Sequence, residues 1–449
     1  YTNLFVPSFE TDQDEEVERK TEMQMLNGGG GAVWRFKGNK AAKEAASVSM
    51  KGILSRLFEN CSRDGKKNIL PLGHCDPIVY PCFKTSAEAE EAVAESLRSG
   101  AANSYGPGVG ILPARRAVAN YLNSDLPHKL KSDDIFMTIG CCQGIETMIQ
   151  VLSSPKSNIL LSSLVYPLYH SYAIHDLVEI RKYELLPDQD WEIDLQSVEA
   201  IADHNTVAMV ICNPHNPCGN VYTYHHLKKV AEMARKLGIM VISDEVFKET
   251  IYGKNPFVPM GIFASIVPVV TLGSISKGWL VPGWRIGWMA MNDPSNVFKT
   301  TGVVESIKHL LNISPDPSTI LQFALPNILE KTKKDYFEKK NLTLSQNVDM
   351  MFDALKEIPC LVCPKKPESC TSLVTKLDLS LLEDITDDVD FCMKLAREEN
   401  LVLFFFLSRE VFGKNNWVRI SIGVERSMLQ DAFVRLKSFF TRHVKTQTI

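Results

Sequence analysis

The chain has 449 residues, of which 45% are hydrophobic and 23% are charged, as is ordinary for a globular protein with a large buried core. Its net charge of -4 provides no basic surface for nucleic acid or anionic lipid, and no apolar run reaches the ~20 residues of a membrane span. We therefore expect neither nucleic-acid nor membrane partners. Residues 1–20 are acidic and lack the apolar core of a signal peptide, which favours a cytosolic location.

Four regions are predicted along the chain. Residues 1–31 are polar and end in a run of glycines, with neither a strand before them nor a helix start after them, so we expect a flexible tail and no phosphate loop. Residues 32–67 are predicted to join a smaller domain, residues 68–317 to form a large domain, and residues 318–449 to form a small C-terminal α+β domain.

The large domain alternates apolar runs with helical patterns. Thr223 is a plausible N-cap, buried positions follow it at helical spacing, and Gly238 is placed to end that helix. Buried strands are predicted at residues 207–212, 239–242 and 267–272. Strands that alternate with helices indicate parallel pairing, so the expected fold class is α/β. In the smaller domain the patterns predict strands at 370–377 and 417–422 and helices at 389–399 and 428–443.

The 11 cysteines do not indicate a disulfide framework, because a chain of this length does not need one. Cys360, Cys363 and Cys370 begin like a zinc motif, but no fourth ligand follows at a suitable spacing and Pro364 and Pro367 indicate a loop. We therefore predict no metal site.

Polar residues follow each of the three predicted strands, where the active sites of open α/β sheets form. Asn213–Gly219 follows the first strand, Ser243-Asp244-Glu245 the second, and Ser274–Lys277 the third, with Arg285 eight residues beyond the lysine. Each segment alone is weak, because Asn-Pro is a common turn and a single Asp or Lys is usually a solvated surface residue. Their order along the chain is difficult to produce by chance.

Together these residues resemble the fold-type I pyridoxal-phosphate (PLP) aminotransferases. The similarity is to the plant tyrosine aminotransferase-like subgroup, which includes S-alkyl-thiohydroximate and cystine C–S lyases, and it covers roughly residues 33–443. The motifs that carry it are Tyr105-Gly106-Pro107-Gly108, Asn213–Gly219, Ser243-Asp244-Glu245, Ser274–Lys277, Pro282–Arg285 and Asn416–Arg419. The resemblance implies a large domain with a mainly parallel sheet between helices, a smaller α+β domain, and PLP as cofactor.

The resemblance also implies roles for individual residues. Lys277 matches the lysine that forms an imine with PLP and moves the Cα proton, and Asp244 matches the carboxylate that keeps the pyridine nitrogen protonated. Ser274, Arg285 and the backbone amides of Cys141 and Cys142 match the phosphate-binding groups, and we expect the two thiols to be incidental.

Further matches concern the cofactor ring, the substrate and the partner subunit. Asn216 matches the donor to the ring oxygen, and Tyr166 is either the aromatic that stacks on the ring or a core residue. Arg419 matches the arginine that binds the substrate carboxylate bidentately. Tyr105 matches a residue that reaches the phosphate of the partner subunit, which implies a homodimer with shared active sites.

Three features depart from the family pattern. Phe247 stands where the family usually has a tyrosine that hydrogen-bonds the ring oxygen, and Cys75 replaces a glycine that lies against the substrate. Residues 403–410 form an apolar run without the family's Pro-Gly pair, which indicates either a wall of the pocket or a foreign insertion such as translated intron.

The leading hypothesis is transamination of tyrosine or phenylalanine with a 2-oxo acid such as 2-oxoglutarate. The second is β-elimination from S-substituted cysteine conjugates by a C–S lyase. The third is a catalytically inactive relative that binds or regulates, which the three departures motivate and the intact set of predicted active-site residues opposes.

Overall fold

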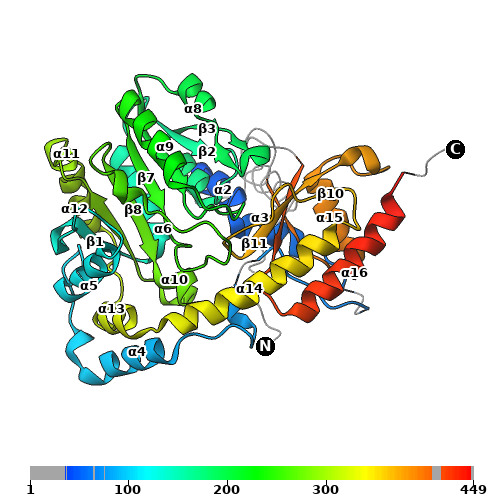
Figure 1. Ribbon diagram of the computed structural model, residues 1–449, viewed down its shortest axis with the longest axis horizontal. Coiled ribbons are helices and arrows are strands. Elements are labelled where there is room, and N and C mark those ends of the chain that lie inside the picture. Colours follow the sequence, from blue (N-terminus) through cyan, green and yellow to red (C-terminus); the bar gives the residue numbers. More distant parts are fainter. Residues whose placement is uncertain (1–35, 37, 64–65, 75, 407–415, 446–449) are drawn as a thin grey trace, which may run out of the picture.

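The computed structural model describes residues 36, 38–63, 66–74, 76–406 and 416–445. Its centre is a seven-stranded sheet of order β1-β9-β8-β7-β6-β2-β3 (Figure 1). The strands are β1 (Ile135–Thr138), β2 (Asn158–Ser162), β3 (Glu179–Tyr183), β6 (Thr206–Cys212), β7 (Met240–Asp244), β8 (Val269–Ser274) and β9 (Gly287–Asn292). Within this sheet β9 pairs antiparallel with both β1 and β8, and the other pairings are parallel. The predicted mainly parallel α/β sheet is confirmed.

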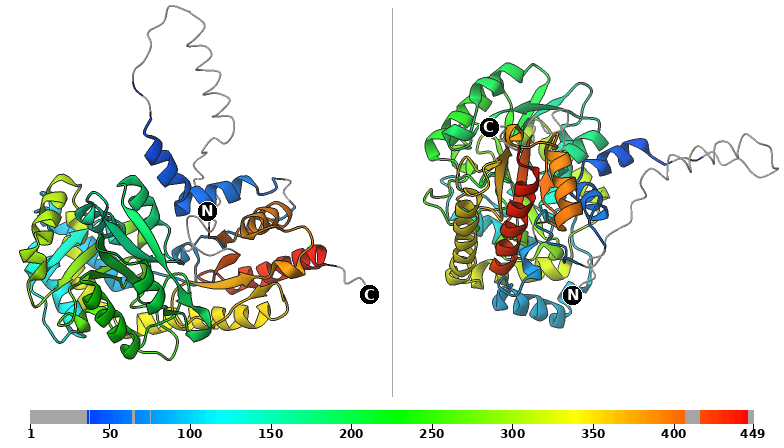
Figure 2. Two further views of the ribbon diagram at one scale, coloured as in Figure 1. Left: turned by 90° about the horizontal axis from the view of Figure 1, so that it is seen from above. Right: turned by 90° about the vertical axis from the view of Figure 1, so that its right-hand side faces the viewer.

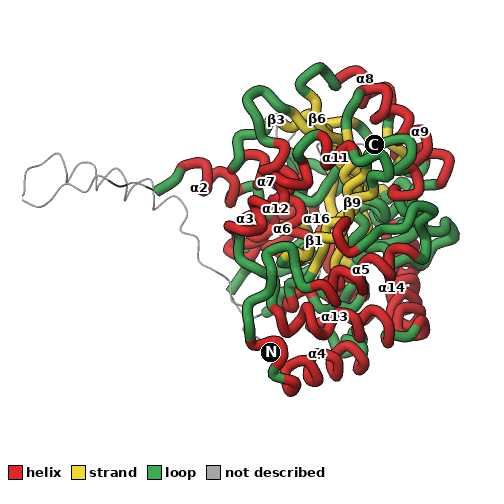
Figure 3. The backbone as a smooth tube through the Cα atoms, turned by 90° about the vertical axis from the view of Figure 1, so that its left-hand side faces the viewer, coloured by secondary structure: helices red, strands yellow, loops and turns green. Residues whose placement is uncertain are grey.

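Helices cover both faces of this sheet, which explains why its central strands are apolar at consecutive positions (Figure 3). On β6, Met209 and Ile211 pack in one core with Leu227, whereas Val210 faces a second core that contains Ile149. The first face carries α5 (Leu112–Asn123) and α9 (Tyr224–Leu237), and the second carries α6 (Gly140–Leu152), α7 (Leu168–His175) and α12 (Val303–Ile313).

Helix α9 begins and ends where its sequence predicts. The Thr223 hydroxyl oxygen accepts a hydrogen bond from the His226 amide at 3.2 Å, which satisfies one of the free amides of the first turn. Gly238 ends the helix with φ 70°, a left-handed conformation that costs glycine little. The chain then enters β7, which begins two residues after this glycine.

A second sheet of order β10-β11-β13-β12 is antiparallel throughout and lies at the other end of the molecule (Figure 1). Its strands are β10 (Leu361–Val362), β11 (Ser372–Leu377), β12 (Phe404–Phe405) and β13 (Trp417–Ser421). Helices α15 (Asp388–Glu399) and α16 (Arg426–His443) accompany it, and α3 (Met50–Glu59) packs against α15. The strands and helices predicted for residues 370–443 are thus confirmed, with ends shifted by at most two residues.

Two long helices follow one another along the chain after the last strand of the large sheet. Helix α13 (Thr319–Lys331) packs against α4 (Ala87–Ser99) and α5, whereas α14 (Lys334–Leu355) reaches α16. The remaining elements are α2 (Lys40–Ser47), β4 (Leu185–Leu186), β5 (Glu192–Ile193), α8 (Leu195–Ile201), α10 (Ile275–Gly278), α11 (Val297–Thr300) and 3-10 turns at Pro77–Val79, Ala101–Asn103, Ser132–Asp134, Pro187–Gln189, Met260–Phe263, Pro282–Trp284 and Leu379–Leu381. Seen from above, α2 projects from the body of the molecule next to α7, on which it packs (Figure 2).

None of the helices in the described residues is both long enough and apolar enough to cross a membrane. The described part of the chain also holds no group of three or more His, Cys, Asp or Glu side chains placed to bind a metal. The thiols of Cys363 and Cys370 instead donate to the carbonyls of Lys365 and His215.

Candidate active site

The carboxyl ends of β6, β7 and β8 bring the predicted catalytic residues together. Cys212 pairs with Asp244, and Asp244 pairs with Leu272, so the segments after these strands leave the sheet side by side. Ser274 ends β8 and caps α10, where its hydroxyl oxygen accepts a hydrogen bond from the Ser276 amide at 3.3 Å. This single turn carries Lys277, whose positive charge acts on the Asp244 carboxylate.

Asp244 is a buried carboxylate whose two oxygens both accept hydrogen bonds. The Tyr169 hydroxyl donates to Oδ2 at 3.1 Å, and the Val246 amide and the Cys141 thiol donate to Oδ1 at 3.2 Å and 3.7 Å. Burial raises the pKa of Asp244, while these donors and the Lys277 charge oppose the rise. A cationic group beside the carboxylate would offset the cost of its burial, so the site fits a protonated ring nitrogen.

The other end of the site is built to receive an anion. Gly140 opens α6 with φ 67°, and a Cβ there would lie 2.3 Å from Nη2 of Arg285. The Arg285 guanidinium donates to the carbonyls of Pro282 at 2.7 Å and Ile139 at 3.2 Å, which holds it against the start of the helix. The backbone amides of Cys141 and Cys142 lie in the first turn, where amides lack partners within the helix and favour negative charge.

Phe247 and His74 lie near the Lys277 amine. Its Nζ lies 5.9 Å from the centre of the Phe247 ring, so the position of the family's tyrosine does face the lysine. His74 is close enough to feel the charges of both Lys277 and Arg419. Burial lowers the pKa of His74, and these two cations lower it further although Asp76 acts in the opposite direction. A neutral imidazole is therefore expected there at neutral pH.

Arg419 lies on β13 and only 3% of its surface is exposed. Its Nη2 donates to the Gly73 carbonyl at 2.9 Å, and its guanidinium lies 4.6 Å from the centre of the Phe404 ring. The Nε–H has no hydrogen-bond partner among the described residues. A buried guanidinium with a free donor fits a substrate carboxylate, which would satisfy both its charge and its N–H.

The other predicted residues differ in how closely they join this cluster. Tyr166 is half-buried and its hydroxyl feels the Cys142 thiol and the Arg419 charge, while burial raises the pKa of the phenol. Asn216 is half-buried in the loop after β6. Tyr105 is fully exposed, and in the described residues no contact joins it to the cluster. Cys75 lies outside the described residues.

The comparisons with known proteins agree with this geometry. The profile of the family described as aminotransferase class I and II matches residues 79–436. The chain belongs to the class I and II aminotransferase family. It is 60% identical over 445 residues to the S-alkyl-thiohydroximate lyase SUR1 of Arabidopsis thaliana, a match that covers 99% of this chain and 94% of that protein. It is 58% identical over 444 residues to the "probable aminotransferase TAT1" of Arabidopsis thaliana, covering 99% and 96% of the two chains.

Among solved structures, the tyrosine aminotransferase of Leishmania infantum superposes with a TM-score of 0.84 at 28% identity, over 92% of this chain and all of that one. This aminotransferase-family enzyme therefore has the fold-type I architecture and uses PLP. Its residues fit that cofactor, because a buried carboxylate, a lysine amine and a glycine-lined anion cradle lie at one edge of the sheet, after β7, β8 and β1.

Sequence reasoning missed or undervalued two groups at this site. The Cys141 thiol, which we expected to be incidental, donates to Asp244 at 3.7 Å. Tyr169 was not predicted at all, although it lies in the first turn of α7, three residues after the predicted Tyr166, and its hydroxyl donates to Asp244. The Phe404–Phe406 run is fully buried, pairs in part with β13 and supports Arg419, whereas residues 407–415 lie outside the described residues.

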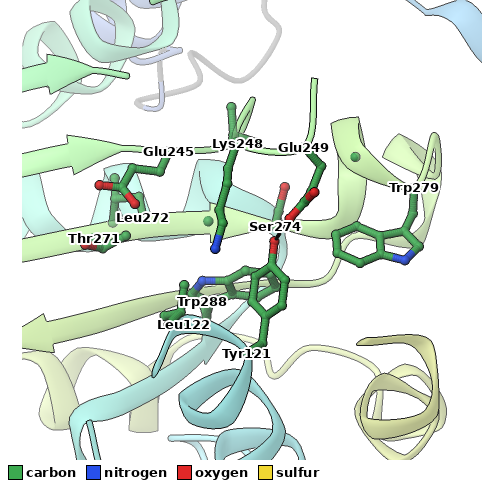
Figure 4. A pocket seen from close by; sticks show the side chains of 13 residues that line it. Tyr121, Leu122, Glu245, Lys248, Glu249, Thr271, Leu272, Ser274, Trp279 and Trp288 are labelled. Carbon is green, nitrogen blue, oxygen red and sulfur yellow. Dashed lines mark hydrogen bonds between the residues drawn. The ribbon is translucent and has the colours of Figure 1, made fainter. Parts of the chain in front are cut away.

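A separate small cavity lies behind Ser274. Figure 4 shows Tyr121, Glu249, Trp279 and Trp288 around it, with the Tyr121 hydroxyl directed toward Glu249, to which it donates a hydrogen bond. Lys277 does not line this cavity. The cavity therefore lies behind the turn that carries Lys277 and does not form part of the face that would receive substrate.

Proposed function

We propose that the enzyme transaminates an aromatic amino acid, tyrosine or phenylalanine, with a 2-oxo acid as acceptor. The observation that best supports an amino-acid substrate is the buried guanidinium of Arg419, whose Nε–H has no hydrogen-bond partner among the described residues and whose charge, like that of Lys277, acts on His74. A base and a carboxylate-binding group near one another suit an α-amino acid, whose reacting Cα is bonded to its carboxylate.

Each residue then has a distinct task. When bound, PLP supplies an aldehyde that bonds to amines and a ring that delocalises electrons released at the substrate Cα. Lys277 would hold the cofactor through Nζ and, once replaced by the substrate amine, take the proton from Cα. Asp244 would hold a proton on the ring nitrogen, and Arg285 with the α6 amides would hold the phosphate. Arg419 would bind and orient the substrate carboxylate.

Aromatic side chains near the two ends of the site support an aromatic substrate. Phe247 faces Lys277, and Tyr166 is close to Arg419. Flat rings of this kind favour offset or edge-to-face contact with another ring, which is worth about 0.5–1.5 kcal/mol beyond burial. The structural likeness to a tyrosine aminotransferase points to the same class of substrate.

A C–S lyase on S-substituted cysteine conjugates is the second candidate, because the relative SUR1, at 60% identity, is named an S-alkyl-thiohydroximate lyase. Both reactions begin with the same proton removal by Lys277. They diverge because a cysteine conjugate has a sulfur leaving group on Cβ, whereas tyrosine has none and can only be reprotonated. The substrate's own chemistry therefore separates the two functions.

Parallel assays test the proposal. Purified enzyme with PLP is offered tyrosine with 2-oxoglutarate, and separately a cysteine S-conjugate, with Lys277→Ala as the inactive control. We expect glutamate and 4-hydroxyphenylpyruvate with the higher kcat/KM, and borohydride should fix the cofactor to Lys277. A higher kcat/KM for release of thiol and ammonia would replace transaminase by lyase as the preferred function. Cofactor fixed to another lysine would remove the basis of both.

We also propose that the enzyme is a homodimer whose active sites are shared. The supporting observation is Tyr105, a large phenol that is completely exposed in the single chain. An exposed aromatic of this kind suits contact with a second subunit, where its hydroxyl would donate to the partner's cofactor phosphate.

A further inference from the structure

Helix α14 is the one long described helix that runs alongside both sheets. Figure 1 shows it passing under the end of the large sheet near α10 and continuing to α16 at the small sheet. Lys340 and Asn347 are seven residues apart on it, so they project from nearly the same face, about 10 Å apart along the axis. Both side chains are buried, with 5% and 2% exposed.

Lys340 binds the segments around Lys277. Its Nζ donates to the carbonyls of Gly278 and Glu249, both at 2.9 Å, and to the Thr250 hydroxyl at 3.2 Å. Gly278 directly follows Lys277, and Glu249 lies two residues after Phe247. Three acceptors match the three N–H groups of an ammonium. Burial lowers the pKa of Lys340 to about 7, and the charge of Glu249 opposes this lowering.

A ring contact strengthens the same attachment. Phe337, one turn before Lys340, meets the Trp279 ring edge-on with centres 5.1 Å apart. Asn341 adds hydrogen bonds from Nδ2 to the carbonyls of Glu249 at 3.2 Å and Ile251 at 2.9 Å. The first half of α14 therefore fixes both the turn that carries Lys277 and the loop that carries Phe247.

Asn347 binds the continuation of the Arg419 strand. Its Nδ2 donates to the carbonyls of Ile422 and Val424, both at 2.9 Å. Ile422 lies three residues after Arg419 and immediately after the end of β13. The second half of α14 therefore fixes the strand that presents the guanidinium.

We propose that α14 sets the separation between the Lys277 amine and the Arg419 guanidinium, with Lys340 as a positioning residue for the first and Asn347 for the second. The inference rests on the proposed function, in which one amino acid must reach both groups. Because the helix is stiff, its two anchoring side chains hold the two ends of the substrate site in register. Removing either anchor then disturbs one end and leaves the other in place.

The test compares each anchor with a neighbour on the same helix. Lys340→Met is paired with the exposed Lys339→Met, and Asn347→Leu with the exposed Gln346→Leu. Two quantities are measured on the full-length protein. The first is the rate at which added PLP becomes bonded to Lys277, followed by visible absorbance and borohydride fixation. The second is the Kd of 3-phenylpropionate, an amine-free analogue of phenylalanine, read from the cofactor's absorbance.

We expect Lys340→Met to slow bonding to Lys277 at least about tenfold while the Kd stays within about twofold. Asn347→Leu should raise the Kd about tenfold and leave the bonding rate within about twofold, since a misplacement of ~1 Å can cost up to about a hundredfold and a fraction of this shift is expected. The milder Lys340→Gln and Asn347→Ser should show the same two patterns with smaller factors. They supply the answer if the first pair does not fold.

Equal changes of both quantities in both variants would show general loosening and overturn the inference, as would anchor variants that behave like their neighbours. A wild-type protein that does not bond PLP at Lys277 would overturn the proposed function and the inference together. A wild type that bonds PLP normally, with anchor variants no different from their controls, would overturn the inference alone.

Discussion

Phe247 places a ring without a hydroxyl 5.9 Å from the Lys277 amine. A tyrosine there would bring a phenol donor to the cofactor's ring oxygen, where Asn216 is the remaining predicted donor. When the Lys277–cofactor nitrogen carries its proton, the positive charge there balances the negative ring oxygen. Once that proton is lost, the oxygen needs another partner, so a phenol donor stabilises the deprotonated form more. We expect Phe247→Tyr to lower the pKa of this nitrogen by about one to two units, from ~1.5–3 kcal/mol for a hydrogen bond to a charged group.

Spectral titration of the cofactor band without substrate measures this pKa. Phe247→Leu serves as control, since it changes the side chain without adding a donor and should not lower the pKa. An unchanged titration for Phe247→Tyr would show that the side chain does not reach the ring oxygen.

We expect Glu245 to make the stability of the enzyme depend on pH. Burial raises its pKa from 4.5 to about 7, although the Met260 amide at 2.9 Å and the Ser243 hydroxyl at 3.0 Å both donate to Oε1. Between these two pH values the folded chain keeps a proton that the unfolded chain has lost. The contribution of Glu245 to the free energy of unfolding therefore falls as pH rises through this window, by about 3 kcal/mol in total.

Glu245→Gln should remove this decline because the amide is always neutral and its oxygen can still accept from both donors. Urea unfolding at pH 5, 6 and 7 with saturating PLP measures the free energy of unfolding of both proteins. The contributions of other titrating groups cancel in the difference between the two values. We expect the variant to gain stability relative to the wild type as pH rises. Parallel curves would mean that Glu245 is ionised in the fold throughout this range.

At the scale of an element, the cap of α9 can be tested without disturbing the core. Thr223 is exposed, and its hydroxyl oxygen accepts a hydrogen bond from the His226 amide. Thr223→Ala leaves this amide without its partner and should lower the free energy of unfolding by about 1 kcal/mol, whereas Thr223→Ser should retain most of it. Urea unfolding midpoints at fixed pH give the comparison, and equal losses in the two variants would contradict capping by the hydroxyl.

Elements with a strong local signal were predictable from the sequence, and those that depend on distant partners were not. Strand β6 and helix α9 have apolar periodicity, a cap and a terminal glycine within one stretch of chain. Strand β9 was not predicted, and although it pairs antiparallel with the preceding strand β8, its other partner is β1, some 150 residues earlier in the chain. The predicted boundary between domains at residue 318 remains a prediction.

The same distinction holds within the site. Lys277, Asp244 and Arg419 stand in motifs that can be read along the chain, and the structure places their elements around one region. Lys340 looks like an ordinary surface lysine in a helical segment, and its acceptors at Gly278 and Glu249 lie 62 and 91 residues away. A buried lysine can be recognised only once folding has brought those carbonyls together.

At the scale of the whole molecule, the proposed dimer makes a prediction about mixed subunits. A Lys277→Ala chain and a Tyr105→Phe chain each have a lesion in both sites of their homodimers. In a heterodimer with shared sites, the Tyr105→Phe chain still supplies Lys277 and receives an intact Tyr105 from its partner. One of the two sites is then free of both lesions.

We expect verified heterodimers, isolated with two different tags, to recover about half of the wild-type activity per dimer. The assay uses limiting PLP. A hydrogen bond to a charged phosphate is worth ~1.5–3 kcal/mol, so loss of the Tyr105 hydroxyl weakens binding of the cofactor. The sites of Tyr105→Phe homodimers are then mostly without cofactor. If Tyr105 serves its own chain instead, each heterodimer has one site without the lysine and one without the phenol. Its activity would then equal the mean of the two homodimers, and the shared site would be excluded.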